Sequence, residues 1–183
     1  TVILTEAQRV RAVQISGTQG GDGQAAQLDL DADALNDLSS NTNLQSPGVL
    51  LIETADTTIP EVQNATLDLN DGTLIFEASE TIDADPIANV DPSKLSLSNI
   101  AGDDQITLEG ATVSPSELPR ATITLTEQQR VDAIANSGTS GGDGTGMVFD
   151  AKAAAMQDVA INNNVDNIGL NLIEIADTTP PDI

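Results

Sequence analysis

The sequence predicts an all-β chain of immunoglobulin-like β-sandwich repeats, with one short helix in each repeat. Residues 1–62 align without a gap with residues 122–183, an offset of 121, and 30 of the 62 aligned positions are identical. Short runs of alternating apolar and polar residues, separated by turn sequences, predict about seven strands in each period. Phe76 and Phe149 are the only aromatic residues. A core of small aliphatic side chains suits a thin sandwich better than a deep enzyme cleft.

The internal repetition indicates that the chain is a piece of a tandem array. We expect residues 1–58 to be the C-terminal half of one repeat, residues 59–179 to be a complete repeat, and residues 180–183 to begin the next. On this division, residues 1–58 would expose an unpaired strand edge, which is a template for another chain. The apolar side chains exposed with it would be Val2, Leu4, Leu51 and Ile52.

We therefore expect the partners of this chain to be copies of itself. Either the preceding segment of a longer polypeptide completes the half-repeat, or a neighbouring subunit donates strands and a filament grows head to tail.

The earlier half of the complete period, residues 59–120, reads as a series of short strands. Asn70-Asp71-Gly72 is a strong hairpin signal between two alternating runs. In the second run Leu74, Phe76 and Ala78 share one face. The expected strands are Val62–Leu69, Thr73–Ser79, Lys94–Ser98 and Ile106–Val113; the expected loops are Ile82–Pro92, Ser114–Pro119 and a turn containing Asp103-Asp104.

The later half, present in both copies, contains the helix. Thr126 and Gln129 have the spacing of a capping box, which predicts a helix near residues 126–136, and Gly138 is expected to end it. The glycines of residues 141–144 predict a loop with positive φ angles. The expected strands of this half are Ala121–Leu125, Met147–Asp150 and Ile168–Ala176, the last with a bulge.

The composition excludes several classes of function. Six basic residues face 29 acidic ones, so the formal net charge is −23. Such a surface repels phosphate backbones and attracts cations, which argues against nucleic acid as a partner. Cys and His are absent, which removes thiolate and imidazole metal sites and most nucleophile–base pairs. No apolar run is long enough for membrane insertion.

An enzyme is also disfavoured. With 29 acidic side chains, some carboxylate pairs will lie at suitable distances by chance, so a pair alone does not indicate a glycosidase. Trp and Tyr, whose faces usually line sugar sites, are absent.

Calcium is the expected cofactor. Ca²⁺ takes about six to eight oxygen ligands, which closely spaced carboxylates and loop carbonyls supply. Two recurring pairs flank the expected repeat junctions, two further aspartates lie near the other end of the sandwich loops, and one aspartate lies in each glycine-rich loop. The alternative is a solvated acidic linker that keeps the array soluble. These candidate metal ligands are Glu53 with Asp56, Glu174 with Asp177, Asp83 with Asp85, and Asp22 and Asp143.

Asp37 and Asp158 also recur at the offset of 121. We expect each of these two side chains to cap its own turn, as aspartate commonly does.

Three motifs resemble the bacterial Ig-like repeats that occur in tandem in very large cell-surface and adhesin-type proteins. Asp177-Thr178-Thr179-Pro180-Pro181 resembles their inter-repeat junction. Phe76-Glu77-Ala78-Ser79-Glu80-Thr81-Ile82-Asp83 resembles their Phe-x-x-Ser-Glu-x-(Val/Ile)-Asp strand. Asp158-Val159-Ala160-Ile161-Asn162 resembles their late Asp-x-Ala-Gly-Asn turn, with Ile161 at the usual glycine position.

The resemblance implies an extracellular location on a bacterial cell surface. We expect a non-enzymatic structural repeat of a secreted cell-surface, adhesin or filament protein, rigidified by calcium at its inter-repeat junctions. The alternative is a module for cell adhesion that binds a glycan, a protein or a mineral surface. The fold itself does not decide between them, because one fold hosts many functions.

Overall fold

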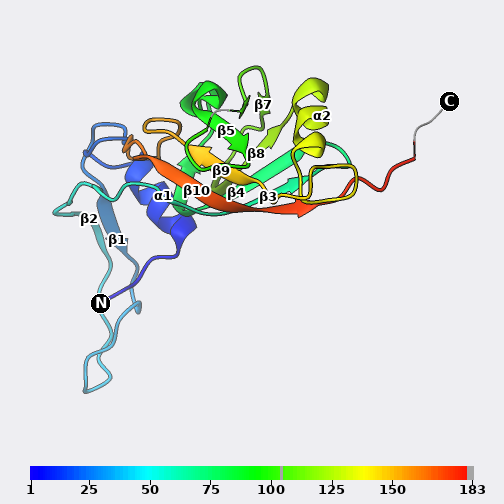
Figure 1. Cartoon of the computed structure of the whole chain (residues 1–183). Helices are drawn as coiled ribbons and strands as arrows, with labels where there is room; N and C mark the ends of the chain where they lie inside the picture. The colour runs from blue at the N-terminus through cyan, green and yellow to red at the C-terminus, as the bar shows by residue number, and fades with distance from the viewer. Residues whose placement is uncertain (104, 181–183) are drawn as a thin grey trace. The chain divides into compact units, whose positions relative to one another are not determined.

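A computed structural model describes residues 1–103 and 105–180 (Figure 1). The chain separates into two compact units, Thr1–Thr57 and Thr58–Ile183. Asp104 of the expected turn and residues 181–183 of the expected next repeat lie outside the described residues. In the described part of the chain, no helix is long and apolar enough to cross a membrane.

The second unit is a single curled sheet with one α-helix, rather than an immunoglobulin-like sandwich. The strand order is β6-β5-β9-β10-β3-β4-β8-β7. Its elements are β3 (Val62–Asp68), β4 (Thr73–Asp83), the 3-10 turns η1 (Ile87–Asn89) and η2 (Pro92–Lys94), β5 (Leu95–Ser98), β6 (Ile106–Thr107), β7 (Thr112–Val113), β8 (Glu117–Thr124), α2 (Glu127–Ala135), β9 (Val148–Ala151) and β10 (Asn167–Ile175).

The predicted fold class, an immunoglobulin-like sandwich, is therefore wrong. An immunoglobulin sandwich has two antiparallel sheets packed face to face, whereas here β10 joins both groups of strands into one mixed sheet. β10 pairs antiparallel with β9 on one side and parallel with β3 on the other. Alternation of apolar residues predicts strands and their inward faces, but it does not predict which strands become neighbours.

The curl follows from the contact between the two phenylalanines. Phe76 on β4 and Phe149 on β9 are separated by β10 and β3, and a flat sheet would place strands three steps apart at about 14 Å. Their ring centroids are only 5.5 Å apart, in a stacked arrangement with an interplanar angle of 23°. The sheet must therefore bend into a half-barrel, with its core on the concave side.

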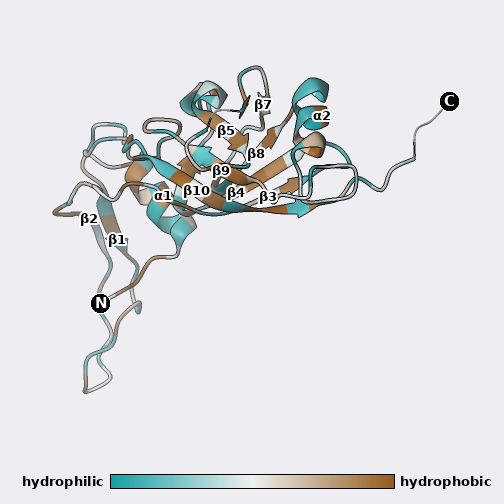
Figure 2. Ribbon diagram, viewed as in Figure 1, coloured by the Kyte–Doolittle hydropathy of each residue, from teal (hydrophilic) through white to brown (hydrophobic). Residues whose placement is uncertain are grey.

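The core is built from the small aliphatic residues that the composition predicted. Leu74, Phe76 and Ala78 of β4 are buried, whereas Glu77 between them is exposed, so the predicted inward face of this strand is confirmed. The predicted hairpin of β3 and β4 is confirmed by their antiparallel register. Many of the hydrophobic residues of this unit lie on its strands (Figure 2).

The predicted helix is present, and its cap is the predicted one. Thr126 accepts a hydrogen bond from the backbone N–H of Gln129, and the Gln129 side chain accepts one from the backbone N–H of Thr126. The helix ends at the C-cap Asn136, so the expectation that Gly138 ends it is wrong. Gly141 and Gly144 have φ angles of +95° and +87°, as the glycine-rich loop predicted.

Three segments differ from their predicted structure. Glu117–Thr124 forms one strand that includes the end of the expected loop at Ser114–Pro119. The expected strand Ile106–Val113 is divided into β6 and β7, with Gly110 between them at φ +86°. The bulge expected where the alternation changes phase at Leu172 and Ile173 is absent, because these residues pair with β3 in an unbroken register; β10 instead has a register shift against β9 between Asn167 and Leu170.

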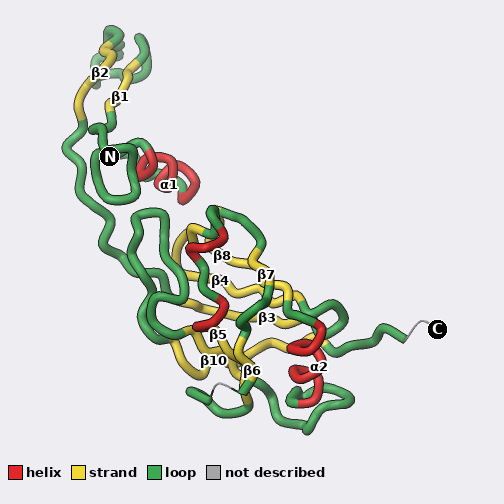
Figure 3. Tube along the Cα trace, turned by 90° about the horizontal axis from the view of Figure 1, so that it is seen from above, coloured by secondary structure: helices red, strands yellow, loops and turns green. Residues whose placement is uncertain are grey.

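The first unit contains only α1 (Glu6–Gln14), β1 (Gln27–Leu30) and β2 (Ser46–Leu50) in its described residues. β1 and β2 pair antiparallel as a sheet of two strands (Figure 3). The pairing of Leu28 with Val49 has the same register as that of Phe149 with Leu170, after the offset of 121. The two copies of the repeated segment therefore adopt the same local pairing.

Truncation of the same aligned position in the two copies should have very different effects on stability. Phe149→Ala should reduce the free energy of unfolding of the second unit by about 3–5 kcal/mol, because it removes a fully buried ring. Leu28→Ala, at the aligned position of the first unit, should change stability by less than about 0.5 kcal/mol because Leu28 is exposed. Urea unfolding followed by circular dichroism measures both, and equal losses would contradict the described core.

Candidate functional site

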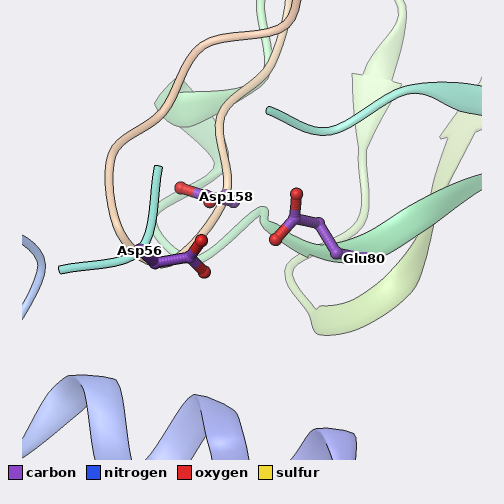
Figure 4. A group of neighbouring side chains, drawn as sticks. All are labelled: Asp56, Glu80 and Asp158. Carbon is purple, nitrogen blue, oxygen red and sulfur yellow. The ribbon is translucent and has the colours of Figure 1, made fainter. Parts of the chain in front are cut away.

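The candidate metal site of the second unit is a pair of buried carboxylates. Glu80 lies on β4, and Asp158 is brought beside that strand by an isolated bridge with Ile82. Both side chains are buried, and each offers an oxygen within 4.8 Å of the other (Figure 4). Two ionised carboxylates at this distance repel by an amount on the order of 3 kcal/mol at an effective dielectric constant of about 20. A divalent cation between them would turn this repulsion into attraction.

Asp158 also has the structural role that was predicted for it. Its Oδ1 accepts a hydrogen bond of 2.7 Å from the backbone N–H of Asn162, and its Oδ2 accepts one of 2.9 Å from the Asn162 side chain. Ile161, at the usual glycine position of this turn, has a φ angle of +64°, which is rare for a β-branched residue. The turn thus holds the Asp158 carboxylate in a fixed orientation beside Glu80.

Figure 4 also draws Asp56, which belongs to the first unit. Within that unit, the Asp56 carboxylate accepts a hydrogen bond from Nη1 of Arg9. Arg9 also forms an ion pair with Glu6 at 2.7 Å. Asp56 is one of the predicted metal ligands, and it lies two residues before Thr58, where the second unit begins.

Asp177, the predicted ligand that aligns with Asp56, takes part in the same arrangement. Arg130 on α2 donates to Asp177 at 3.0 Å, to Glu127 at 2.8 Å and to the backbone carbonyl of Leu69 at 2.9 Å. The hydrogen bond from the Thr179 backbone N–H, together with the Arg130 guanidinium, lowers the pKa of Asp177 below its ordinary value. Arg130 thus connects the helix to the end of β10 through its ion pair with Asp177, and to the end of β3 through its hydrogen bond to Leu69.

Glu174 and Glu53, the other predicted junction ligands, bind backbone N–H groups. Glu174 accepts hydrogen bonds from Gly138 at 2.8 Å and from Met147 at 2.7 Å. Glu53 accepts the equivalent pair from Gly17 at 3.0 Å and from Ala26 at 2.9 Å. This carboxylate therefore joins both ends of the glycine-rich loop to β10 in the second unit, and to the segment after β2 in the first unit.

The aspartates of the glycine-rich loops support turns. Asp22 accepts a hydrogen bond from the backbone N–H of Gln24 at 2.9 Å. Asp143 accepts one from Thr145 at 2.7 Å and another from the Asn99 side chain at 2.6 Å. The contacts with Gln24 and Thr145 are the two-residue contacts that aspartate commonly makes in turns.

Asp83 is the predicted ligand nearest in sequence to the buried pair. Its backbone N–H donates to the carbonyl of Gln157, the residue before Asp158, at 3.0 Å. Its carboxylate accepts hydrogen bonds from the Asp85 backbone at 3.3 Å and from the Asn89 side chain at 2.7 Å. Burial raises the pKa of Asp83 above its ordinary value. Asp83 therefore lies on β4 three residues after Glu80, and the backbone N–H of Asp85 donates to its carboxylate.

The structure thus singles out two carboxylates that the list of predicted ligands did not contain. Glu80 was known only as part of a strand motif and Asp158 only as a turn residue. The one signal in the sequence was the recurrence of Asp158 as Asp37. The proximity to Glu80 depends on the bridge between Ile82 and Asp158, a contact between residues 76 positions apart in the sequence.

The Arg130–Asp177 ion pair gives a pH-dependent prediction. Because the pKa of Asp177 is lowered in the folded state from 3.8, the ionised carboxylate contributes stability above that value. This contribution is lost as the pH falls through the folded-state pKa. Asp177→Asn should therefore lower the denaturation midpoint at pH 7, and the difference from the natural chain should disappear in strong acid.

Asp132→Asn is the matched control, because Asp132 is an exposed carboxylate on the same helix that accepts a hydrogen bond from Gln128. The measurement is urea unfolding of the three proteins between pH 2 and pH 7. An effect of Asp177→Asn that is the same at both ends of this range would contradict the role of the ion pair.

Comparisons of the chain with models of protein families, with curated proteins and with solved structures found no match. Function must therefore be inferred from the internal repeat and from the described side chains.

Proposed function

We propose that the chain is part of a non-enzymatic structural repeat protein that binds calcium. In keeping with the sequence resemblance described above, the proposed setting is a secreted adhesin or filament protein of a bacterial cell surface. The observation that carries this proposal is the recurrence of individual hydrogen bonds at the offset of 121.

The recurring contacts are structural rather than catalytic. The Glu53 and Glu174 carboxylates bind equivalent pairs of backbone N–H groups. Gly48 donates to Asp29 at 2.7 Å, and Gly169 donates to Asp150 at 2.5 Å. The glutamate contacts hold the glycine-rich loop, and the aspartate contacts join the two paired strands of each copy. Repeated units that preserve such contacts are typical of arrays in which each unit supports the next.

Calcium is the metal that the candidate site favours. Only oxygen ligands are available, because the chain has no Cys or His, and oxygen is the ligand atom of hard cations. Ca²⁺ accepts irregular geometry, whereas Mg²⁺ requires near-octahedral coordination. The net charge of −23 also favours cation binding over the whole chain.

Within the second unit, Glu80 and Asp158 each offer one carboxylate oxygen as a ligand. Calcium bound there would hold the turn that carries Asp158 against β4.

A calcium titration tests the proposal. Ion binding to the folded state at 100 times Kd adds about 2.7 kcal/mol of stability, so millimolar Ca²⁺ should raise the melting temperature by several degrees and Mg²⁺ should raise it less. Glu80→Gln should remove most of the response to Ca²⁺. It should also stabilise the metal-free protein, because it relieves the repulsion with Asp158.

Glu77→Gln is the matched control on the same strand, since Glu77 is exposed and accepts a hydrogen bond from Asn64. This variant should retain the full calcium response. Sodium chloride at equal ionic strength controls for screening. If sodium chloride reproduces the whole shift, the acidic residues are a solvated surface and the calcium proposal is wrong.

A further inference from the structure

The first unit preserves the local structure of the later half-repeat. Asn41 donates to Asp37 as Asn162 does to Asp158, at 2.8 Å and 2.7 Å. The side chain of Arg9 binds Glu6 and Asp56, as that of Arg130 binds Glu127 and Asp177. These contacts form within the repeated segment alone, so they do not require the rest of the repeat.

Burial of the apolar side chains differs sharply between the two copies. Leu28 is 42% exposed, whereas the aligned Phe149 is fully buried. Leu35 is 58% exposed, whereas the aligned Met156 is 1% exposed. The same contrast holds for Val2 and Ile123, Leu38 and Val159, and Leu51 and Leu172.

In the second unit, three of these positions pair with neighbouring strands that come from residues 58–120. Phe149 on β9 pairs with Leu97 on β5. Leu172 on β10 pairs with Ala65 on β3. Ile123 on β8 pairs with Leu74 on β4. Among the described residues of the first unit, β1 and β2 pair only with each other.

We propose that these exposed apolar side chains, Val2, Leu28, Leu35, Leu38 and Leu51, bind an earlier half-repeat with the strand pattern of residues 58–120. The occupant would place the equivalents of β3 and β5 against β2 and β1. This inference rests on the proposed tandem array. It specifies which side chains of the later half-repeat would contact the earlier half-repeat.

Residues 58–120 of the same molecule are excluded as the occupant by the topology. They already form the core with β8, β9 and β10 of the second unit. Moreover, β3 runs parallel to β10, so pairing β3 with the strand of the first unit would require a parallel crossover. Residues 52–54 align with the end of β10, and only seven residues lie between them and Val62. A connection between parallel strands needs about a dozen residues or more, so this segment is too short for the crossover.

The position of the occupant in the chain follows from β8. This strand runs without interruption from Glu117 to Thr124 and so crosses from the earlier to the later half of the repeat at residues 120 and 121. Val2 aligns with Ile123 of that strand. An earlier half-repeat that ends in the sequence pattern of Glu117–Ala121 would complete the equivalent of β8 at Val2.

The test is a fusion in which a second copy of residues 58–121 precedes Thr1 of the complete chain, which reproduces the natural spacing. Hydrogen exchange at residues 27–30 and 46–50 should slow by about 1000-fold or more, as expected when a marginal segment joins a folded core. The control fusion carries Phe76→Asp and Leu97→Asp in the added copy only. It should leave the exchange of these residues unchanged.

Two outcomes would overturn the inference. If the intact fusion leaves exchange at residues 27–30 and 46–50 unchanged, the first unit does not accept a half-repeat. If the unfused chain already protects these residues and light scattering shows an oligomer, the occupant is a second copy. In either case a calcium response that depends on Glu80 would still stand, so the failure of this inference can be distinguished from failure of the proposed calcium function.

Discussion

The parallel pairing of β10 with β3 is the constraint on which the second unit depends. β10 comes from the repeated half and β3 from the half that occurs once, so this pairing joins the two halves into one sheet. It is reinforced where the strands end: the Leu69 backbone N–H donates to the carbonyl of Ile175 at 2.9 Å. Arg130 contacts the Leu69 carbonyl and the Asp177 carboxylate at the same end. Without this pairing, β9 and β10 would have the exposed apolar face that β1 and β2 have.

The acidic composition is largely used to organise loops. Carboxylates at Glu174, Asp143, Asp150 and Asp158 accept hydrogen bonds from backbone N–H groups that irregular segments would otherwise leave without strand partners. Such charge-assisted bonds are stronger than neutral ones. This explains how a chain with few aromatic residues and a net charge of −23 can hold long loops in place. The buried pair Glu80 and Asp158 differs, because two carboxylates meet there and a cation would stabilise them.

Local features of the fold could be predicted because their causes are local. The capping box of Thr126 and Gln129, the hairpin at Asn70-Asp71-Gly72 and the positive φ angles of Gly141 and Gly144 each depend on a few neighbouring residues. The sheet architecture could not be predicted in the same way. Whether Leu172 lies beside Ala65 or faces it across a sandwich is decided by the packing of the whole core, and the same alternating sequence is compatible with both. The carboxylate pair depends on this packing too, which is why Glu80 was not among the predicted ligands.

The central claim is that the repeated segment forms its turns and local pairing alone but needs the earlier half-repeat to bury its apolar face. Hydrogen exchange on the unmodified chain, resolved by residue and compared between aligned positions, tests it most directly. Amides of β1 and β2 should exchange orders of magnitude faster than those of β9 and β10, although the two pairs share the same register. Equal protection of the aligned strands in a monomeric chain would contradict the claim.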